Sequence, residues 1–241
     1  MLFQYKMINE YFWNQLILSA LYCAKPNELN DPFDCSIDWN TALTKAISNK
    51  NIIEYHRQIL EKIYEGFKAY NPCLNVGVSC FTNNCESPLM WSHYADSHRG
   101  VCLAYDLEIE NIYQEYPSSS DFFLMGGASV QYGENSFSDW LLNGKLNEPI
   151  KDNPVGNAAI KIYTSKSQAW HYEEEFRLVT NKEGLIKIPP SSLKQVTFGL
   201  KISQQNKSSI KKIARMHNPD VIFSNVMKST EDDMGLNIID D

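Results

Sequence analysis

Two glutamates and an arginine late in the chain are the residues best suited to chemistry. Glu173 and Glu175 lead into an apolar stretch that also holds Arg177. In a β-strand successive side chains point to opposite faces, so Glu173, Glu175 and Arg177 would share one face while Phe176 and Leu178 anchor the other. A carboxylate beside an arginine can be a structural ion pair or a catalytic group whose charge the cation sets. The sequence leaves both interpretations open.

A loop motif early in the chain, Asn30-Asp31-Pro32-Phe33-Asp34, directly follows a predicted strand. Asn and Asp accept tight backbone conformations and cap nearby amides, and proline stiffens a turn. We expect a rigid loop that aims Asp31 or Asp34 into a cleft while Phe33 plugs the loop into the core. The alternative is that these residues only form a turn.

A third group of polar and aromatic residues runs from Met90 to Gly100. Trp91 and Tyr94 are three residues apart and share a helical face, while His93 points elsewhere. These aromatics are either core residues or a platform for a ligand, with His93 or His98 as a polar contact. The two histidines are five residues apart, which does not favour a shared metal.

Motifs of several common enzyme classes are missing from the sequence. It contains no G-x-G-x-x-G, no Walker loop, no G-x-S-x-G and no H-E-x-x-H. These absences argue against Rossmann dehydrogenases, P-loop nucleotidases, common esterases and the usual zinc proteases.

The charge balance disfavours wholesale binding of nucleic acid. The net charge is −7, from 22 basic and 29 acidic residues, whereas nucleic-acid binding usually needs a basic surface. One local cluster is basic, and we interpret it as a solvated helix face or, alternatively, as a contact for phosphate or nucleic acid. It consists of Lys194, Lys201, Lys207, Lys211, Lys212, Arg215 and His217.

The cysteines and the apolar patterning predict a cytoplasmic protein with reduced thiols and no membrane partner. No apolar run approaches the roughly 20 residues of a membrane span, and no secretory signal is evident. No cysteine pair has C-x-x-C spacing, so the sequence does not predict a zinc site. The six cysteines are Cys23, Cys35, Cys73, Cys80, Cys85 and Cys102.

Periodicity and turn residues predict mixed helices and strands in the first half of the chain. Helices are expected at 8–18, at 41–70 with a break at Ser48-Asn49, and at 88–96; strands are expected at 2–6, 20–24, 75–82 and 101–106.

The second half begins with two regions rich in Gly, Ser, Asn and Pro, 115–126 and 133–157, which we expect to be loops or insertions. Residues 158–165 fit a strand or a helix. A strand at 175–181 should form a hairpin with 185–188 across Lys182-Glu183-Gly184. Further strands at 196–200, 221–223 and 225–239 and a helix at 204–216 complete the pattern. Length and pattern predict one α+β domain, 1–241, with a mixed, largely antiparallel central sheet flanked by helices.

Read together, the motifs resemble the bacterial domain-of-unknown-function family twenty-nine seventy-one, some members of which are associated with abortive infection and phage defence. We read the resemblance over nearly the whole chain. The residues that carry it are Leu2-Phe3-Gln4-Tyr5-Lys6, Leu21-Tyr22 through Asn30-Asp31-Pro32-Phe33-Asp34, Ser79-Cys80-Phe81-Thr82, Leu89 to Asp96 with Gly100-Val101-Cys102, and Lys166…Trp170-x-Tyr172-Glu173-x-Glu175-x-Arg177.

A more distant resemblance is to ADP-ribosyltransferases of the DNA-modifying toxin type, in the order strand, short helix, strand and a glutamate at the head of a late strand. Lys6 stands where many of these enzymes carry His or Arg. The resemblance implies an ADP-ribosyltransferase-like fold and NAD as the substrate, with no metal. It implies that Glu175, with Glu173 as the second candidate, stabilises the oxocarbenium-like sugar or orients the nucleophile.

The same resemblance implies which residues hold the substrate. Tyr5, Tyr22, Trp91 or Tyr94 would hold the nicotinamide, and Lys6, Asn30 and Arg177 would grip the diphosphate. Asp31 and His93 complete the predicted substrate-binding set. We expect the Asn30–Asp34 loop, the 88–100 segment and the Glu173–Arg177 segment to converge on one cleft.

Three functions therefore remain. The first is an NAD-consuming transferase or glycohydrolase acting as a toxin in anti-phage defence, with a nucleic-acid or protein acceptor. The second is a catalytically silent binding or sensor module, with a partner protein from a defence operon. The third is a nuclease or other hydrolase that uses Asp31, Asp34, His93 and Glu175.

Overall fold

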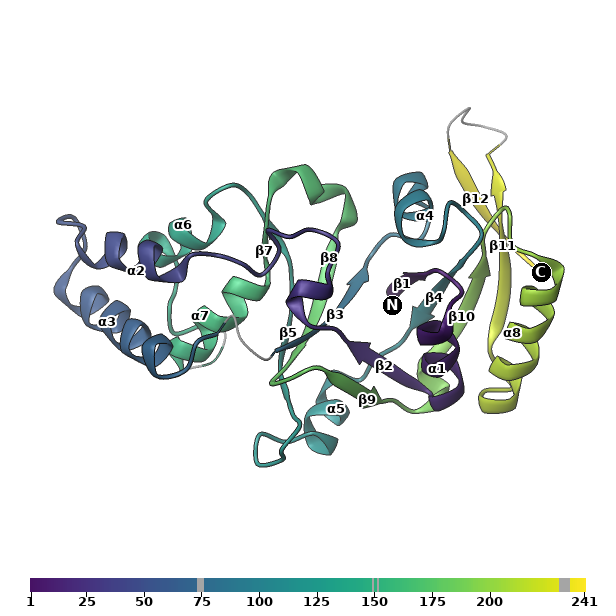
Figure 1. The fold of residues 1–241 in the computed structure, drawn as a ribbon, viewed down its shortest axis with the longest axis horizontal. Coiled ribbons are helices and arrows are strands. Elements are labelled where there is room, and N and C mark those ends of the chain that lie inside the picture. Colours follow the sequence, from purple (N-terminus) through teal and green to yellow (C-terminus); the bar gives the residue numbers. More distant parts are fainter. Residues whose placement is uncertain (73–75, 149, 151, 230–234) are drawn as a thin grey trace.

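An eight-stranded sheet organises the fold, in the order β12-β11-β10-β4-β1-β3-β8-β5 (Figure 1). The computed structural model describes residues 1–72, 76–148, 150, 152–229 and 235–241. All neighbouring strands are antiparallel except β10 and β11, which confirms the predicted α+β fold with a mixed, largely antiparallel sheet. The strands are β1 (Leu2–Lys6), β3 (Gly77–Thr82), β4 (Val101–Tyr105), β5 (Leu124–Ser129), β8 (Glu175–Thr180), β10 (Leu193–Phe198), β11 (Ile222–Lys228) and β12 (Leu236–Asp240). Part of the predicted strand 225–239, residues 230–234, lies outside the described residues, as do Cys73 and the first residue of the predicted strand 75–82.

Two short strand pairs lie beside the main sheet. β2 (Ala20–Cys23) pairs with β9 (Gly184–Lys187), and β6 (Gln131–Tyr132) pairs in parallel with β7 (Ser165–Lys166). The predicted hairpin between 175–181 and 185–188 is therefore wrong. β3 and β5 occupy both edges of β8, so the chain after the turn pairs with β2 instead.

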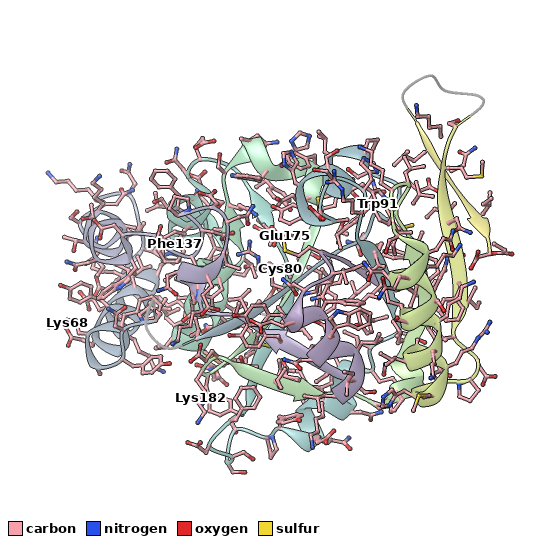
Figure 2. All side chains as sticks on the ribbon, turned by 45° about the vertical axis from the view of Figure 1, so that its right-hand side comes forward. Lys68, Cys80, Trp91, Phe137, Glu175 and Lys182 are labelled. Atoms are coloured by element: carbon pink, nitrogen blue, oxygen red, sulfur yellow. The ribbon has the colours of Figure 1, made fainter. Side chains whose placement is uncertain are left out.

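Helices cover both faces of the sheet. α1 (Glu10–Leu18) and α8 (Gln204–His217) pack on one face, where Phe12 and Ile210 join a core of strand residues. α4 (Pro88–Tyr94) lies on the opposite face, where Met90 and Trp91 pack against Tyr5 of β1. Trp91 of this helix is labelled in Figure 2.

A second helical group forms the left end of the molecule in Figure 1. It has its own core, which includes Leu60, Phe137 and Ile162 and continues onto Val179 of β8. The helices of this group are α2 (Trp39–Ile47), α3 (Glu54–Ala69), α6 (Ser136–Asn143) and α7 (Pro154–Tyr163). The elements that remain are α5 (Ile109–Glu115) and the 3₁₀ helices η1 (Pro26–Glu28), η2 (Gln168–Glu173) and η3 (Pro190–Ser192).

The loop prediction for 133–157 misread helix caps as loop residues. Asn153 accepts a hydrogen bond from the Gly156 amide and Pro154 takes the first helical position of α7. These are the residue types that begin helices. Gly144 is the C-cap of α6, and glycine is a residue type that commonly ends helices. In the other predicted loop, 115–126, the strand β5 begins at Leu124.

The centre of the sheet is opened between β1 and β3. β1 pairs with β4 along all its residues and β3 pairs with β8 along all of its own, but among the described residues Phe3 opposite Thr82 is the one register pair between β1 and β3. Beyond that pair the Gln4 side chain bridges the gap, since its Nε2 donates to Ser79 Oγ and to the Cys80 carbonyl, both at 3.1 Å. The site described below lies at this opening.

The sequence predicts reduced cysteines and no membrane-spanning segment. Cys23, Cys35, Cys80, Cys85 and Cys102 carry free thiols. Among the helices of the described residues, none has the length and apolar character needed to cross a bilayer.

Candidate functional site

The Asn30–Asp34 loop is a rigid turn that directs its two aspartates inward. Asp31 Oδ1 accepts the Phe33 amide, its carbonyl accepts the Asp34 amide, both at 3.0 Å, and Ser36 Oγ donates to the Phe33 carbonyl at 2.7 Å. Asp31 and Asp34 are buried, whereas Phe33 is 84% exposed. The prediction that Phe33 plugs into the core is wrong, because the turn that buries the flanking carboxylates points the ring between them outward.

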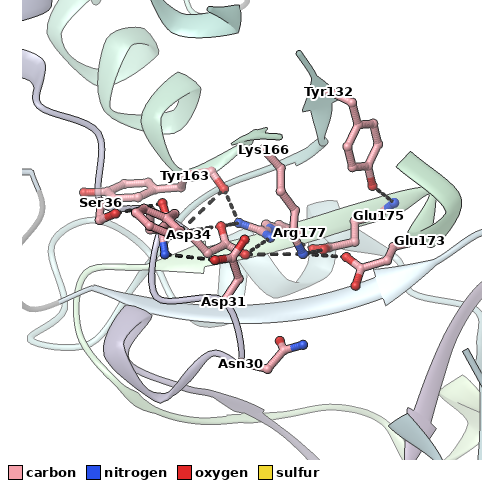
Figure 3. A network of polar contacts seen from close by, with 12 residues as sticks. Asn30, Asp31, Asp34, Ser36, Tyr132, Tyr163, Lys166, Glu173, Glu175 and Arg177 are labelled. Carbon is pink, nitrogen blue, oxygen red and sulfur yellow. Dashed lines mark hydrogen bonds and ion pairs between the residues drawn. The ribbon is translucent and has the colours of Figure 1, made fainter. Parts of the chain in front are cut away.

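Arg177 is the centre of a buried ionic network (Figure 3). It follows Glu175 by two residues on β8, so the predicted alternation places both side chains on one face. The guanidinium is completely buried and donates to both oxygens of Asp34 at 2.7 Å. It also donates to Glu175 Oε2 at 2.6 Å and to the Tyr163 carbonyl at 2.8 Å. This fork-to-carboxylate geometry is the strongest form of the pair.

Lys166 extends the network, and the sequence analysis did not place it in the site. Its ammonium lies 2.5 Å from Glu173 Oε2, 2.5 Å from Glu175 Oε1 and 3.4 Å from Asp34 Oδ2. Lys166 belongs to β7, a strand of two residues that is fixed by pairing with Tyr132 of β6. The Tyr132 hydroxyl in turn accepts the Glu175 amide at 2.8 Å.

Glu173 reaches this network by a different route from the one predicted. It is the last residue of η2 rather than a strand residue, and Glu174 adopts a left-handed conformation with φ 46°. That kink reverses the chain between Glu173 and Glu175, so their carboxylates meet at Lys166 without strand alternation. A left-handed glutamate is uncommon, and no residue-type signal in the sequence predicted it.

The environment sets the two glutamates to opposite protonation states. Burial and the neighbouring Glu175 carboxylate raise the pKa of Glu173 to about 7. Burial alone would raise the pKa of Glu175 as well, but the charges of Arg177 and Lys166 hold that pKa well below its usual range. Burial opposes the charge of Lys166, but Glu175, Asp34 and Glu173 outweigh it and raise the Lys166 pKa. Three carboxylates against two cations explain why one carboxyl holds a proton near neutral pH.

Tyr94 and Asn30 connect the network to solvent. Asn30 Nδ2 donates to the Tyr94 hydroxyl at 2.8 Å, and that hydroxyl donates to Glu173 Oε1. Burial, followed by the hydrogen bond to Glu173, raises the pKa of Tyr94 above its usual value. The tyrosine therefore acts as a neutral hydrogen-bond donor to the carboxylate.

A cavity of about 380 Å³ lies against this network, at the opening between β1 and β3. Gln4 and Ser79 line it from the two separated strands. The three segments predicted to converge all contribute to its wall, as do β1 and β2. Of the predicted site residues, those that line the cavity are Tyr5, Lys6, Tyr22, Asn30, His93, Tyr94, Glu173, Glu175 and Arg177.

Lys6 is the unpaired charge of this cavity. Among the described residues its ammonium has no hydrogen-bond or ion-pair partner. Burial lowers its pKa, and the charges that oppose this effect come from the Cys80 and Cys23 thiols rather than from carboxylates. Lys6 is half-buried, and a cation partly removed from water without a partner favours an anionic group on a ligand.

Two predicted site residues do not line the cavity. Trp91 is completely buried; its ring packs edge-on against Tyr5 at 5.1 Å and its indole donates to the Cys85 carbonyl at 3.0 Å. It supports the wall from behind instead of facing a ligand. Asp31 lines a separate hollow of about 430 Å³, which shares Asp34 and Lys166 with the first.

A further hollow, of about 640 Å³, lacks comparable chemistry. Its charged residues Lys25 and Glu183 pair with each other at 2.9 Å and are both well exposed. Lys182, also in its wall, pairs with Asp121.

Three of the seven residues in the basic cluster around the late helix contact other protein groups. Lys207 lies 2.6 Å from Asp241, and Lys211 pairs with the same carboxylate. The Arg215 guanidinium lies over the Phe223 ring at 5.0 Å. These side chains fasten α8 to β11 and the end of the chain, which leaves less basic surface than the sequence predicted.

Comparison with protein families supports the resemblance over part of the chain. Residues 90–178, from α4 into β8, match the model of the family described as "Protein of unknown function (DUF2971)". The match covers less than half of the chain, not the nearly whole length over which we read the motifs. It includes Lys166, Glu173 and Glu175 but not the Asn30–Asp34 loop. No match was found among curated proteins or among solved structures, so these comparisons give the ADP-ribosyltransferase resemblance no support.

Proposed function

We propose that the cavity between β1 and β3 binds a nucleotide-like ligand, in the first instance NAD, and that the protein cleaves the bond between nicotinamide and ribose. Nicotinamide would leave, and the ADP-ribosyl group would be transferred to an acceptor or to water. The observation that carries this proposal is the pair Glu173 and Glu175, two carboxylates that each lie 2.5 Å from the Lys166 ammonium in the wall of one cavity and whose pKa values are driven in opposite directions by their surroundings. Pairs of titratable groups driven apart in this way mark acid–base assignments in many enzymes.

Glu175 suits the electrostatic role in that reaction. Breaking the bond between ribose and nicotinamide moves the bonding electron pair onto the nicotinamide ring, which leaves neutral, and positive charge develops on the sugar. A carboxylate that stays ionised at all working pH values stabilises this charge without reorganising. Arg177 and Lys166 hold Glu175 in that ionised state and fix both of its oxygens.

Glu173 suits the role of general base. With a pKa near 7 it accepts a proton at neutral pH from the incoming water or acceptor group while the new bond to the sugar forms. Tyr94 donates a hydrogen bond to its other oxygen and keeps it oriented. Lys166 binds both carboxylates and couples their charges.

The remainder of the cavity suits the other parts of such a ligand. Lys6 offers a cation to a phosphate, and Asn30 offers an amide beside it. Tyr22 and Tyr94 supply aromatic faces for a ring. A cavity of about 380 Å³ falls within the range of small-molecule sites.

The experiment is to incubate the protein with NAD and to measure released nicotinamide for the parent, Glu175→Gln and Lys6→Met. Glu175→Gln should lower the rate by roughly 10²-fold or more. Lys6→Met removes no side-chain hydrogen bond or ion pair found among the described residues, so it should keep the fold and weaken NAD binding. Glu148→Gln, at an exposed carboxylate paired with Lys145, is the matched control and should behave as the parent.

Two outcomes would overturn the proposal. The first is a folded parent that binds NAD without releasing nicotinamide, which would favour the binding or sensor module. The second is a Glu175→Gln variant with full activity and an unchanged melting temperature. Growth arrest of bacterial cells by the parent but not by Glu175→Gln would support the toxin role that the family resemblance implies.

The nuclease alternative is less favoured by the arrangement of its four residues. Asp34 has both oxygens bound to Arg177, and Asp31 lines a different hollow from His93 and Glu175. Within the described residues, no group of three or more His, Cys, Asp and Glu side chains is arranged to hold a metal ion.

A further inference from the structure

The second hollow, of about 430 Å³, shares Asp34 and Lys166 with the NAD cavity proposed above. The Asn30–Asp34 loop contributes to both walls: Asn30 lines the first cavity and Asp31 and Phe33 line the second. Segments from η2 and from the start of α6 complete the second wall. The proposed function assigns no role to this hollow.

The charge left over in this hollow is negative. Asp31 is only 7% exposed and accepts the Phe33 amide, yet its carboxylate forms no ion pair with any described residue. Glu134 accepts a hydrogen bond from Ser167 at 3.0 Å and likewise lacks a cation among those residues. Lys166 cannot neutralise them, because three other carboxylates already surround it. Glu134 is exposed, but Asp31 is buried, and a carboxylate buried without a cation is unfavourable until a ligand supplies one.

Two aromatic rings lie in the wall beside these carboxylates. Phe33 is 84% exposed, although large apolar side chains are usually buried, and its backbone is fixed on both sides by the turn. Trp170 lines the same hollow, and its ring already receives one cation, with Lys166 Nζ 5.0 Å from the centroid. Aromatic faces attract cations, and Trp is the strongest of them.

We infer that this hollow binds a basic side chain, an arginine in preference to a lysine, that is presented by a partner or acceptor protein. A guanidinium is planar, so it can stack on an aromatic ring while its N–H groups donate to Asp31 and Glu134. A nucleobase would also stack on the rings, but its phosphates would meet the unneutralised carboxylates. The hollow therefore distinguishes a protein partner from a nucleic-acid one.

The test uses the full chain and three small probes: N-acetyl-arginine amide, the neutral isostere N-acetyl-citrulline amide, and AMP. Binding is followed through the NMR signals of the tryptophan indole N–H groups, with the Trp170 signal assigned by Trp170→Phe. The arginine probe should shift the Trp170 signal in a saturable way, and citrulline and AMP should not.

Two variants and a control connect the binding to the hollow. Glu134→Gln should weaken arginine binding by about threefold, and Phe33→Ala by a similar factor, as expected for a rim charge pair and a partly exposed cation–π contact. Met216→Ala, at a 74% exposed apolar residue on α8, should bind as the parent does.

Equal shifts of the Trp170 signal by citrulline and arginine, or displacement of the arginine probe from the hollow by AMP, would overturn the inference, as would arginine binding that neither variant weakens. None of these measurements depends on turnover of NAD. Failure of this inference and failure of the proposed function can therefore be told apart.

Discussion

The two hollows that share Asp34 and Lys166 differ in the charge that each leaves unpaired. In the first cavity the unpaired group is a cation, Lys6, beside a carboxylate held permanently ionised. In the second it is a carboxylate, Asp31, beside an exposed aromatic ring. Both walls use the same buried ion pairs, so those pairs cannot be what distinguishes the ligands. Under the two binding proposals above, the unpaired groups around the network select what binds, while the network keeps the walls in place.

The largest effect on stability should come from replacing Asp34, which lines both hollows. Asp34→Ala leaves the Arg177 guanidinium buried with one carboxylate instead of two, so the free energy of unfolding should fall by about 3–5 kcal/mol. Thermal and urea unfolding measure this loss. The matched control is Asp121→Ala, which breaks the exposed pair with Lys182 and should cost at most about 1 kcal/mol. Similar losses in the two variants would show that the network does not support the walls.

A second prediction separates the two glutamates by pH. The folded protein keeps a proton on Glu173 up to about pH 7, whereas an ordinary glutamate in the unfolded chain releases it near 4.5. The parent should therefore lose stability as pH rises from about 4.5 to 7. Glu175, whose pKa is lowered in the folded state, should make the protein less stable as pH falls below 4.5.

Glu173→Gln should remove the first of these slopes and leave the second. Melting temperatures measured between about pH 2 and 8 for parent and variant provide the test. An upper slope that is unchanged in Glu173→Gln would mean that another group titrates in that range.

A third prediction concerns the unpaired cation of the first cavity. Lys6→Met should raise the KM for NAD, or the Kd for inorganic pyrophosphate, by about tenfold, which corresponds to the loss of roughly 1.4 kcal/mol. Binding of the arginine probe in the second hollow should not change. A variant that binds pyrophosphate as tightly as the parent would remove Lys6 from the anion site.

The smallest expected effect is the change in stability when the exposed Phe33 ring of the second hollow is removed. Phe33→Ala should change the free energy of unfolding by no more than about 0.5 kcal/mol, because the ring is exposed in the folded protein. Chemical unfolding measures this change. A loss of several kcal/mol would mean that the ring packs against the protein and is not available to a partner.

Local patterns predicted the parts of the site that depend on neighbouring residues. The alternation along 175–178 correctly placed Glu175 and Arg177 on one face, and the turn residues of 30–34 predicted a stiff loop. Patterns of this kind work because strand and turn geometry repeat over two to five residues.

The remaining parts depend on contacts between distant segments. Lys166 enters the site through a pairing of β7 with β6, which comes more than thirty residues earlier in the chain, and two residues of strand give no periodic signal. β9 could have paired with β8 by its turn sequence, but the edges of β8 were already occupied. The left-handed Glu174, which brings Glu173 to Lys166, is stabilised by the contacts made around it and not by its residue type.

The opening between β1 and β3 has a mechanical consequence. The sheet continues across its middle through one backbone register pair and the side chain of Gln4, whereas the strands on either side are joined along their whole length. When two halves of a sheet are pulled apart, the strands separate where the fewest backbone hydrogen bonds must break together. The opening is therefore the most weakly bonded line of this sheet, and the backbone bridge between Ala24 and Val78, with hydrogen bonds of 2.9 and 2.7 Å, is a further link that relative movement of the α8 side and the α3 side of the molecule would have to break (Figure 1).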